Sequence, residues 1–75
     1  MIPHDVLLFG PLRDKYSSSR MTVEMPENST IEALLQQLGI NSDLVKVAVN
    51  GEIVQISEQL HTQSEIALLP PVSGG

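Results

Sequence analysis

Apolar and polar residues near the start of the chain follow the patterns of two short β-strands. Residues 6–9 form an apolar run that Gly10-Pro11 ends, which predicts a first strand. Residues 21–25 alternate between apolar and polar with a period of two, which predicts a second, half-buried strand. Pro11 suits the first turn of a short helix that runs through Tyr16 between them. Strands this close in sequence most simply pair antiparallel.

A helical period of apolar positions follows these strands. The positions recur at i, i+3, i+4 and i+7, on one face of a helix: Ile31, Leu34, Leu35 and Leu38. Ser29 stands three residues before Glu32, which is the spacing of a capping box, so we expect Ser29 to cap the helix. Gly39 occupies the position of a left-handed C-terminal cap. The pattern predicts one amphipathic helix with a signal at each end.

Three more β-prone runs complete the chain. Residues 45–49 and 52–54 flank Asn50-Gly51, a dipeptide that strongly favours a two-residue hairpin turn. Residues 66–69 form a compact apolar strand that two prolines end.

The order of elements is strand, strand, helix, strand, short strand, strand, and it predicts the α+β class. We expect a β-grasp (ubiquitin-like) domain over residues 1–69, with a mixed sheet packed on one main helix. The first and last strands are then the central, parallel pair. Residues 70–75 are expected to form an extended, flexible C-terminal Gly-Gly tail.

The two faces of such a sheet have different surroundings, because one helix covers only one face. The second apolar set, which includes Phe9 and Leu69 with Ile53 nearby, is then left exposed to water. An uncovered apolar sheet face typically marks a site for a protein partner. The alternative is that the short helix from Pro11 to Tyr16, or a loop, folds over it.

Composition narrows the possible functions. The 75 residues include no Cys, and four Lys and Arg stand against nine Asp and Glu, for a net charge of −5. The missing Cys excludes a disulfide scaffold, a Cys-based zinc site and a Cys nucleophile. The acidic balance argues against nucleic-acid binding. It favours either a basic partner surface or simply solubility. Apolar runs are too short to span a membrane, so we expect a cytoplasmic protein.

Side chains that could carry catalysis are few. His4 and His61 are far apart in the sequence and have no neighbour at metal-ligand spacing, so we expect exposed or capping roles and no metal site. The serines at 17–19 lack a nucleophile motif and are expected in a solvated loop. The nine acids are scattered and suggest no acid/base pair.

The end of the sequence has a chemistry of its own. Two prolines cannot donate ladder hydrogen bonds, so they stop the sheet and favour an extended departure of about 20 Å over six residues. The last two residues have no side chain and can enter a tunnel too narrow for a Cβ. They place an unhindered α-carboxylate on Gly75. The segment comprises Pro70, Pro71, Val72, Ser73, Gly74 and Gly75.

Three stretches resemble one known family: residues 9–13 (FGPLR), 48–50 (AVN) and 68–75 (LLPPVSGG). The family is that of the molybdopterin synthase small subunits, the MoaD-type ubiquitin-like sulfur carriers. The resemblance covers essentially the whole chain, and its most specific part is the ending. Gln63-Ser64 departs from the Gly-Asp turn that is common in the family before the last strand.

The resemblance implies a role as a sulfur-donor subunit that is not itself catalytic. An ATP-using, ubiquitin-activating-like enzyme adenylates Gly75, and persulfide sulfur then displaces AMP to leave a thiocarboxylate. This group delivers sulfur to cyclic pyranopterin monophosphate for the dithiolene of the molybdenum cofactor. ATP belongs to the activating partner, and no cofactor is expected to stay bound.

The resemblance also implies partners. The large synthase subunit is expected in a heterotetramer of two small and two large subunits, docked on Phe9, Ile53 and Leu69 and on the tail from Pro70 to Ser73. Gly74 is grouped with Gly75 at the reactive end. Two other functions stay open: a sulfur carrier for thiazole synthesis or tRNA thiolation, and a ubiquitin-like modifier of lysines.

Overall fold

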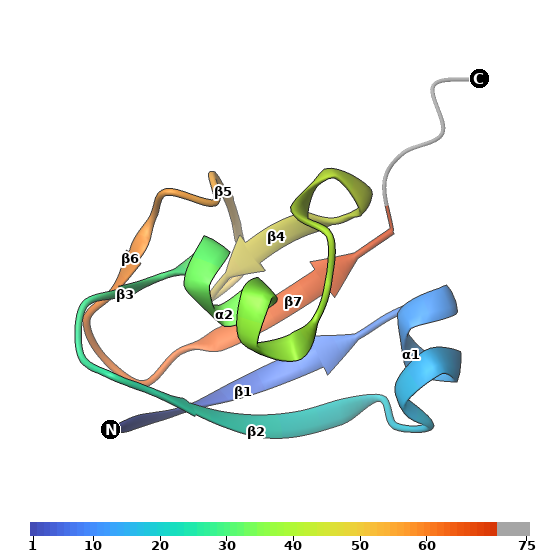
Figure 1. The fold of residues 1–75 in the computed structure, drawn as a ribbon, viewed down its shortest axis with the longest axis horizontal. Helices are drawn as coiled ribbons and strands as arrows, with labels where there is room; N and C mark the ends of the chain where they lie inside the picture. Colours follow the sequence, from blue (N-terminus) through green and yellow to red (C-terminus); the bar gives the residue numbers. More distant parts are fainter. Residues whose placement is uncertain (71–75) are drawn as a thin grey trace.

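The β-strands form one five-stranded mixed sheet and a separate two-stranded sheet (Figure 1). The computed structural model describes residues 1–70. Its elements are β1 (Ile2–Leu8), α1 (Pro11–Tyr16), β2 (Arg20–Met25), β3 (Ser29–Thr30), α2 (Ile31–Leu38), the 3-10 helix η1 (Ser42–Leu44), β4 (Lys46–Val49), β5 (Glu52–Val54), β6 (Gln59–Leu60) and β7 (Glu65–Leu69). Neither α-helix is long and apolar enough to cross a membrane in this part of the chain.

The main sheet has the strand order β2-β1-β7-β4-β5. β1 and β7 form the central parallel pair, and β2, β4 and β5 extend the sheet by antiparallel pairing. α2 crosses one face (Figure 1). The predicted pairing of the first and last strands is therefore confirmed.

The first strand is longer than predicted. It begins at Ile2 rather than at Val6, and Pro3 lies within it opposite Glu24 of β2. The pairing with β7 begins only at Asp5, so the first residues of β1 have a neighbour on one side alone. A proline is tolerated there because no second strand requires its missing N–H.

The small sheet of β3 and β6 was not predicted. Each strand has two residues, and Ser29 pairs with Leu60 across them. Two residues are too short to show a hydrophobic period, so the sequence has no signal for this sheet.

The cap of α2 differs from the prediction by one residue. Thr30, not Ser29, is the N-cap, and its Oγ1 accepts a hydrogen bond of 3.1 Å from the N–H of Ala33. Ser29 pairs in β3, and its hydroxyl donates to the carbonyl of Pro26. The capping-box prediction was therefore wrong, because strand pairing holds Ser29 outside the helix. The left-handed C-cap predicted at Gly39 is confirmed, with a φ of 73°.

The predicted hairpin turn is also confirmed. Asn50 and Gly51 have φ values of 51° and 88°, the left-handed pair that a type I′ turn needs. Asn50 does more than turn the chain: its N–H donates to the carbonyl of Glu65, and its Oδ1 accepts from the N–H of Glu65. The hairpin is thereby bonded to the start of β7.

The hydrophobic core fills the space between α2 and the sheet. Its fully buried aliphatic side chains come from β1, α2, β6 and β7, and are Val6, Leu8, Ile31, Leu34, Leu35, Leu60, Ile66 and Leu68. All four predicted apolar positions of α2 face it, with Leu38 only partly buried.

Two polar residues are buried, His4 and Ser64, and the burial of His4 contradicts the prediction that both histidines are exposed or capping. His4 is fully buried on the inner face of β1, and its Nδ1 accepts a hydrogen bond of 3.2 Å from the N–H of Ser64. Its Nε2 has no partner among the described residues. Burial lowers the pKa of His4 from its ordinary value of 6.5, because the buried imidazolium would lack solvation.

We expect His4 to make the fold less stable in mild acid. Its folded pKa lies below the unfolded one, so the unfolded chain takes up the proton first. The free energy of unfolding should therefore fall as the pH drops below 6.5, and this loss should end below the folded pKa. Urea unfolding at a series of pH values measures it. His4→Leu should flatten the slope, whereas the control His61→Gln should keep it; equal slopes in all three proteins would refute the assignment.

The corrected cap yields a second prediction. Thr30→Ala removes the acceptor for the Ala33 N–H and should lower the free energy of unfolding by about 1 kcal/mol. Ser29→Ala is the matched control, since that hydroxyl caps nothing in α2 and should cost clearly less. Thermal or urea melts compare the two variants. A larger loss for Ser29→Ala would restore the capping box.

Candidate functional site

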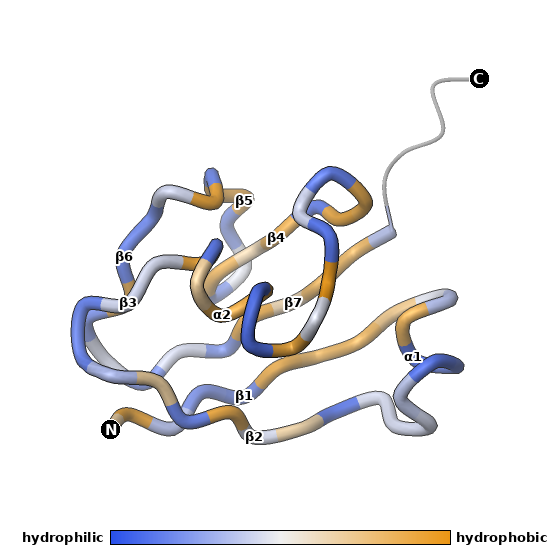
Figure 2. The backbone as a smooth tube through the Cα atoms, in the orientation of Figure 1, coloured by the Kyte–Doolittle hydropathy of each residue, from blue (hydrophilic) through white to orange (hydrophobic). Residues whose placement is uncertain are grey.

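The face of the main sheet opposite α2 carries a continuous apolar row. Strand register aligns Leu7 of β1 with Ala67 of β7, Ala67 with Ala48 of β4, and Ala48 with Ile53 of β5. Their alternate neighbours face the core, so the row lies on the outer side. Figure 2 shows the matching hydropathy, with hydrophobic colour along β7, β4 and the second half of β1. We call this row, together with Phe9 and Leu69, the outer face.

The three residues predicted for docking all belong to this outer face. Ile53 is 63% exposed and Phe9 is 43% exposed, which is unusual for large apolar side chains. Leu69 is half-buried, and alternation along β7 places it on the same side as Ala67. Register and alternation therefore place Ile53 and Leu69 on one face, and Phe9 is exposed directly after the end of β1.

The short helix α1 does not cover the outer face. Leu12 and Tyr16 pack against the core cluster, and the Tyr16 hydroxyl donates a hydrogen bond to the carbonyl of Leu38 at the end of α2. These contacts hold α1 at the end of the sheet, on the side of α2 (Figure 1). The alternative in which α1 folds over the apolar face is thus wrong.

The C-terminal segment begins at the end of β7. Leu69 is the last residue of that central strand, and the exposed Pro70 follows it. Gly10 approaches Pro70 so closely that a Cβ on Gly10 would lie 3.4 Å from Pro70 Cγ, and its φ of 59° also favours glycine. Pro70 therefore lies against the turn that follows Phe9, at the edge of the outer face.

The rest of the predicted tail lies outside the described residues. It comprises Pro71, Val72, Ser73, Gly74 and Gly75. Its extended course and the role of Gly75 stay predictions.

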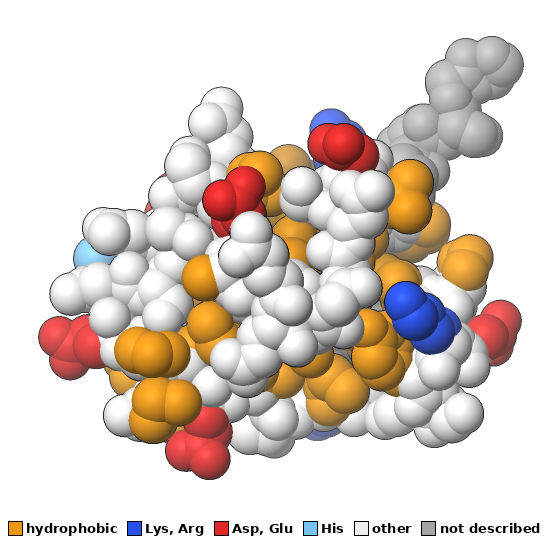
Figure 3. Space-filling view, in the orientation of Figure 1, with side chains coloured by type: hydrophobic (Ala, Val, Ile, Leu, Met, Phe, Trp, Pro, Cys, Tyr) orange, Lys and Arg blue, Asp and Glu red, His pale blue; other side chains and the backbone are white. Residues whose placement is uncertain are grey.

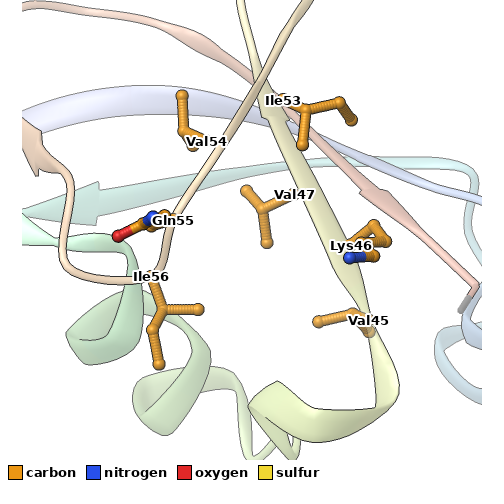
Figure 4. A pocket seen from close by; sticks show the side chains of 7 residues that line it. All are labelled: Val45, Lys46, Val47, Ile53, Val54, Gln55 and Ile56. Carbon is orange, nitrogen blue, oxygen red and sulfur yellow. The ribbon is translucent and has the colours of Figure 1, made fainter.

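A pocket of about 310 Å³ opens between β4 and β5 (Figure 4). Pairing of the two strands stops at Val47 and Val54. Beyond it the chain turns to α2, where the carbonyls of Ile56 and Glu58 accept from N–H groups of the first helical turn. This departure separates the strands. The lining side chains are Val45, Lys46, Val47, Ile53, Val54, Gln55 and Ile56.

Sequence reasoning missed this pocket, because it arises where a hairpin splays to cap a helix. A run such as Ile53-Val54-Gln55-Ile56 indicates only a β-prone segment. Backbone carbonyl groups make the bonds to α2. Every residue has such a group, so the sequence does not show which of them bond to the helix.

Metal-binding and nucleophilic groups do not gather anywhere in residues 1–70. No group of three or more His, Asp or Glu there is placed to hold a metal ion. His61 lies at the surface, with its Nδ1 2.7 Å from Asn28 Oδ1. Ser17 adopts a left-handed conformation at the end of α1, and the Ser18 hydroxyl donates to the carbonyl of Arg20. These serines shape the turn into β2.

Known proteins resemble this chain in sequence and in fold. The sequence profile of the ThiS family matches residues 6–75. The molybdopterin synthase sulfur carrier subunit of Arabidopsis thaliana is 31% identical over 77 residues, spanning 93% of this chain and 80% of that protein.

Solved structures share the fold. SAMP1 from Haloferax volcanii is similar at a TM-score of 0.80 and 27% identity, over 97% of this chain and 99% of that one. A chain of the complex of subunits 1 and 2 of molybdopterin-converting factor from Helicobacter pylori is similar at a TM-score of 0.65 and 24% identity, over 99% and 100%. The predicted ubiquitin-like β-grasp fold is confirmed.

The two faces of the sheet allow a matched test of exposure. Ile53→Thr on the outer face keeps a β-branched side chain in an exposed site, and should change the free energy of unfolding by no more than about 0.5 kcal/mol. Ile66→Thr is the same change in the core and should cost roughly 2 kcal/mol or more, from a lost methyl contact and a buried hydroxyl. Urea unfolding of the isolated protein measures both. Equal losses would show that Ile53 is part of the core.

Proposed function

Because the chain belongs to the ThiS family of ubiquitin-like sulfur carriers, we propose that it is the sulfur carrier subunit of a molybdopterin synthase. The observation that carries this proposal is the relation to the Arabidopsis thaliana sulfur carrier subunit, which extends over nearly the whole chain. The family profile runs through Gly75, the residue that would hold the sulfur.

The reactive group of the proposal is the α-carboxylate of Gly75. A carboxylate is a poor electrophile, so its oxygen first attacks the α-phosphorus of ATP on an activating enzyme and releases pyrophosphate. The terminal sulfur of a persulfide then attacks the acyl carbon and displaces AMP. A thiol cleaves the resulting S–S bond and leaves a thiocarboxylate on Gly75. ATP is a substrate of the activating enzyme, and this chain supplies only the carboxylate.

Sulfur then passes to cyclic pyranopterin monophosphate on the large subunit. The thiocarboxylate sulfur attacks a side-chain carbon of the pterin substrate, and a C–O bond at that carbon breaks, its oxygen leaving as water or remaining on the phosphate. Water then cleaves the acyl–sulfur bond, which leaves the sulfur on the pterin and restores the Gly75 carboxylate. Two loaded small subunits supply the two sulfurs of the dithiolene. Groups for proton transfer belong to the large subunit in this scheme, since the described part of this chain offers no cluster of them. We propose the cytoplasm as the compartment of this reaction.

The outer face supports docking to that large subunit. Phe9 and Ile53 are exposed, Leu69 lies between them in the strand order, and Pro70 follows directly. A partner that covers these residues also receives the tail from Pro71 to Gly74. The similarity to the complex of subunits 1 and 2 of molybdopterin-converting factor supports a two-subunit assembly, proposed as two small and two large subunits.

A second function is favoured by the similarity to SAMP1, a structure described as a small archaeal modifier protein. A modifier uses the same acyl-adenylate on Gly75, but a lysine amine takes the place of sulfur as nucleophile. Sulfur carriers for thiazole synthesis or tRNA thiolation use the same thiocarboxylate with another acceptor. These functions differ in the acceptor, so products separate them.

The proposal is tested by mass spectrometry of the protein after incubation with its activating enzyme, ATP and a sulfur source. One oxygen of Gly75 should be replaced by sulfur, and addition of the large subunit with the pterin substrate should reverse this. Deleting Gly75 is the control: it should abolish loading but leave the thermal melt unchanged, because β7 ends at Leu69. Absence of the thiocarboxylate, or Gly75–Lys bonds to many proteins, would refute the proposal.

A further inference from the structure

The two edges of the main sheet differ in length and regularity. β5 is one edge; it has only three residues, and the chain then leaves the sheet to bond the first turn of α2. β2 is the other edge; its six residues all pair with β1 in one unbroken register (Figure 1). No strand of residues 1–70 pairs with its other side. Exposed edges of this length usually carry a lysine, a proline or a bulge that prevents further pairing, and β2 has none of them.

The backbone groups that face this open edge belong to three residues. Across the β1–β2 pair, the N–H of Leu8 donates a hydrogen bond of 2.9 Å to the carbonyl of Ser19. Bonded positions alternate along an antiparallel pair, so every second residue from Ser19 onward bonds to β1. The residues between them, Arg20, Thr22 and Glu24, therefore direct their N–H and C=O groups away from β1. The same three side chains are exposed.

Ser18 confirms the direction of these groups. Its hydroxyl donates to the carbonyl of Arg20 at 2.6 Å and accepts from the N–H of the same residue at 3.3 Å. One side chain can bond both groups only when both point to the open side of the strand. Within residues 1–70, no other segment bonds the outward groups of Thr22 and Glu24. The edge is thus closed at one end by Ser18 and open along the rest.

The sequence of this edge is complementary to itself. When two copies of β2 pair antiparallel with Thr22 opposite Thr22, Arg20 of each copy lies opposite Glu24 of the other. All three pairs are then of the hydrogen-bonded kind, in which the two residues exchange both backbone bonds. Opposite charges and paired threonines both stabilise cross-strand contacts. A register centred on Arg20 or on Glu24 opposes like charges, and one centred on Met21 or Val23 pairs neither charge with its opposite.

The side of β2 that faces the core adds an apolar contact to this pairing. Val23 is buried on that side, whereas Met21 is only half-buried. In the register centred on Thr22, Met21 lies opposite Val23 of the second copy. Pairing therefore covers apolar surface that the single chain leaves accessible to water.

Charges near the edge permit the contact. Figure 3 shows acidic and basic side chains at the margin of the molecule that β2 forms. The Arg20 guanidinium lies 3.9 Å from a Glu65 carboxylate oxygen, but both side chains are more than half exposed, so this ion pair contributes little and can be exchanged. Each copy carries a net charge of −5. The Debye length is about 8 Å at physiological ionic strength, so acids far from the edge repel the second copy only weakly.

We propose that β2 is a self-pairing edge through which two copies of this chain form a symmetric dimer, with Thr22 on the two-fold axis. The contact is isologous and closes on itself. Its axis is perpendicular to the sheet, so both outer faces lie on the same side and stay open, and the dimer does not depend on the proposed sulfur chemistry. The contact is one strand wide, so association should be weak, with a Kd on the order of 1 mM. Displacement of the Ser18 hydroxyl from Arg20 opposes it.

Exchange of the two charges tests the pairing. Dimerisation of the full chain is followed by NMR, from translational diffusion and from the amide shifts of β2, over a concentration series at physiological salt. Glu24→Arg sets cations opposite each other and should weaken association about tenfold. Glu52→Arg makes the same change in net charge on the exposed opposite edge, β5, and should leave the Kd unchanged. The double variant Arg20→Glu/Glu24→Arg reverses both charges and should restore the wild-type Kd.

A mixture of single variants gives a further outcome. Arg20→Glu and Glu24→Arg should each self-associate more weakly than the wild type, but an equimolar mixture should form a heterodimer, because every charged pair then joins opposite signs. Ser18→Ala frees the backbone groups of Arg20 and should tighten association several-fold. The proposal is overturned if the wild type and Ser18→Ala both stay monomeric at about 1 mM. It is equally overturned if Glu52→Arg weakens association as much as Glu24→Arg, or if the mixture forms no heterodimer.

Discussion

The structure depends on one constraint: a single helix of eight residues must close the core of a five-stranded sheet. α2 buries the inner side chains of the central strands, such as Leu8 and Leu68, and leaves nothing to cover their outer neighbours. Small domains bury a modest share of their surface, and an apolar face left open in this way typically marks a site for a protein partner. Ile53 and Phe9 are exposed for the same reason, because α2 packs on the other face of the sheet.

The parallel pairing of β1 and β7 fixes the place where the chain leaves the sheet after its last strand. The strand that ends the described domain is also central in the sheet, so it is held from both sides by β1 and β4. Pro70 therefore leaves from a rigid position, beside Gly10 on one side and near Lys46 on the other. Two hydrogen bonds between Asn50 and Glu65, one donated by each residue, tie the β4–β5 hairpin to the same strand. β7 thus positions the centre of the outer face and the point at which the chain leaves the sheet.

Local signals predicted most of the architecture. Asn50-Gly51, the apolar face of α2 and the Gly39 cap each depend on neighbours within a few residues, and all were found where the sequence placed them. The errors fall where distant segments compete for one residue. Ser29 lost its capping role because it pairs with Leu60, and His4 was taken into the core by its place opposite Val23. Neither partner is visible from the local pattern.

The sequence by itself determined the order of elements, the two apolar sets of the central strands, and the Gly-Gly ending that marks the family. These depend on periodicity, turn chemistry and residue type, which are local properties. Only the tertiary structure decided which face stays open, where the β4–β5 pocket forms, and which side chains border it. Those features arise from strand register, because pairing across the sheet joins residues such as Lys46 and Leu69 that no sequence spacing relates.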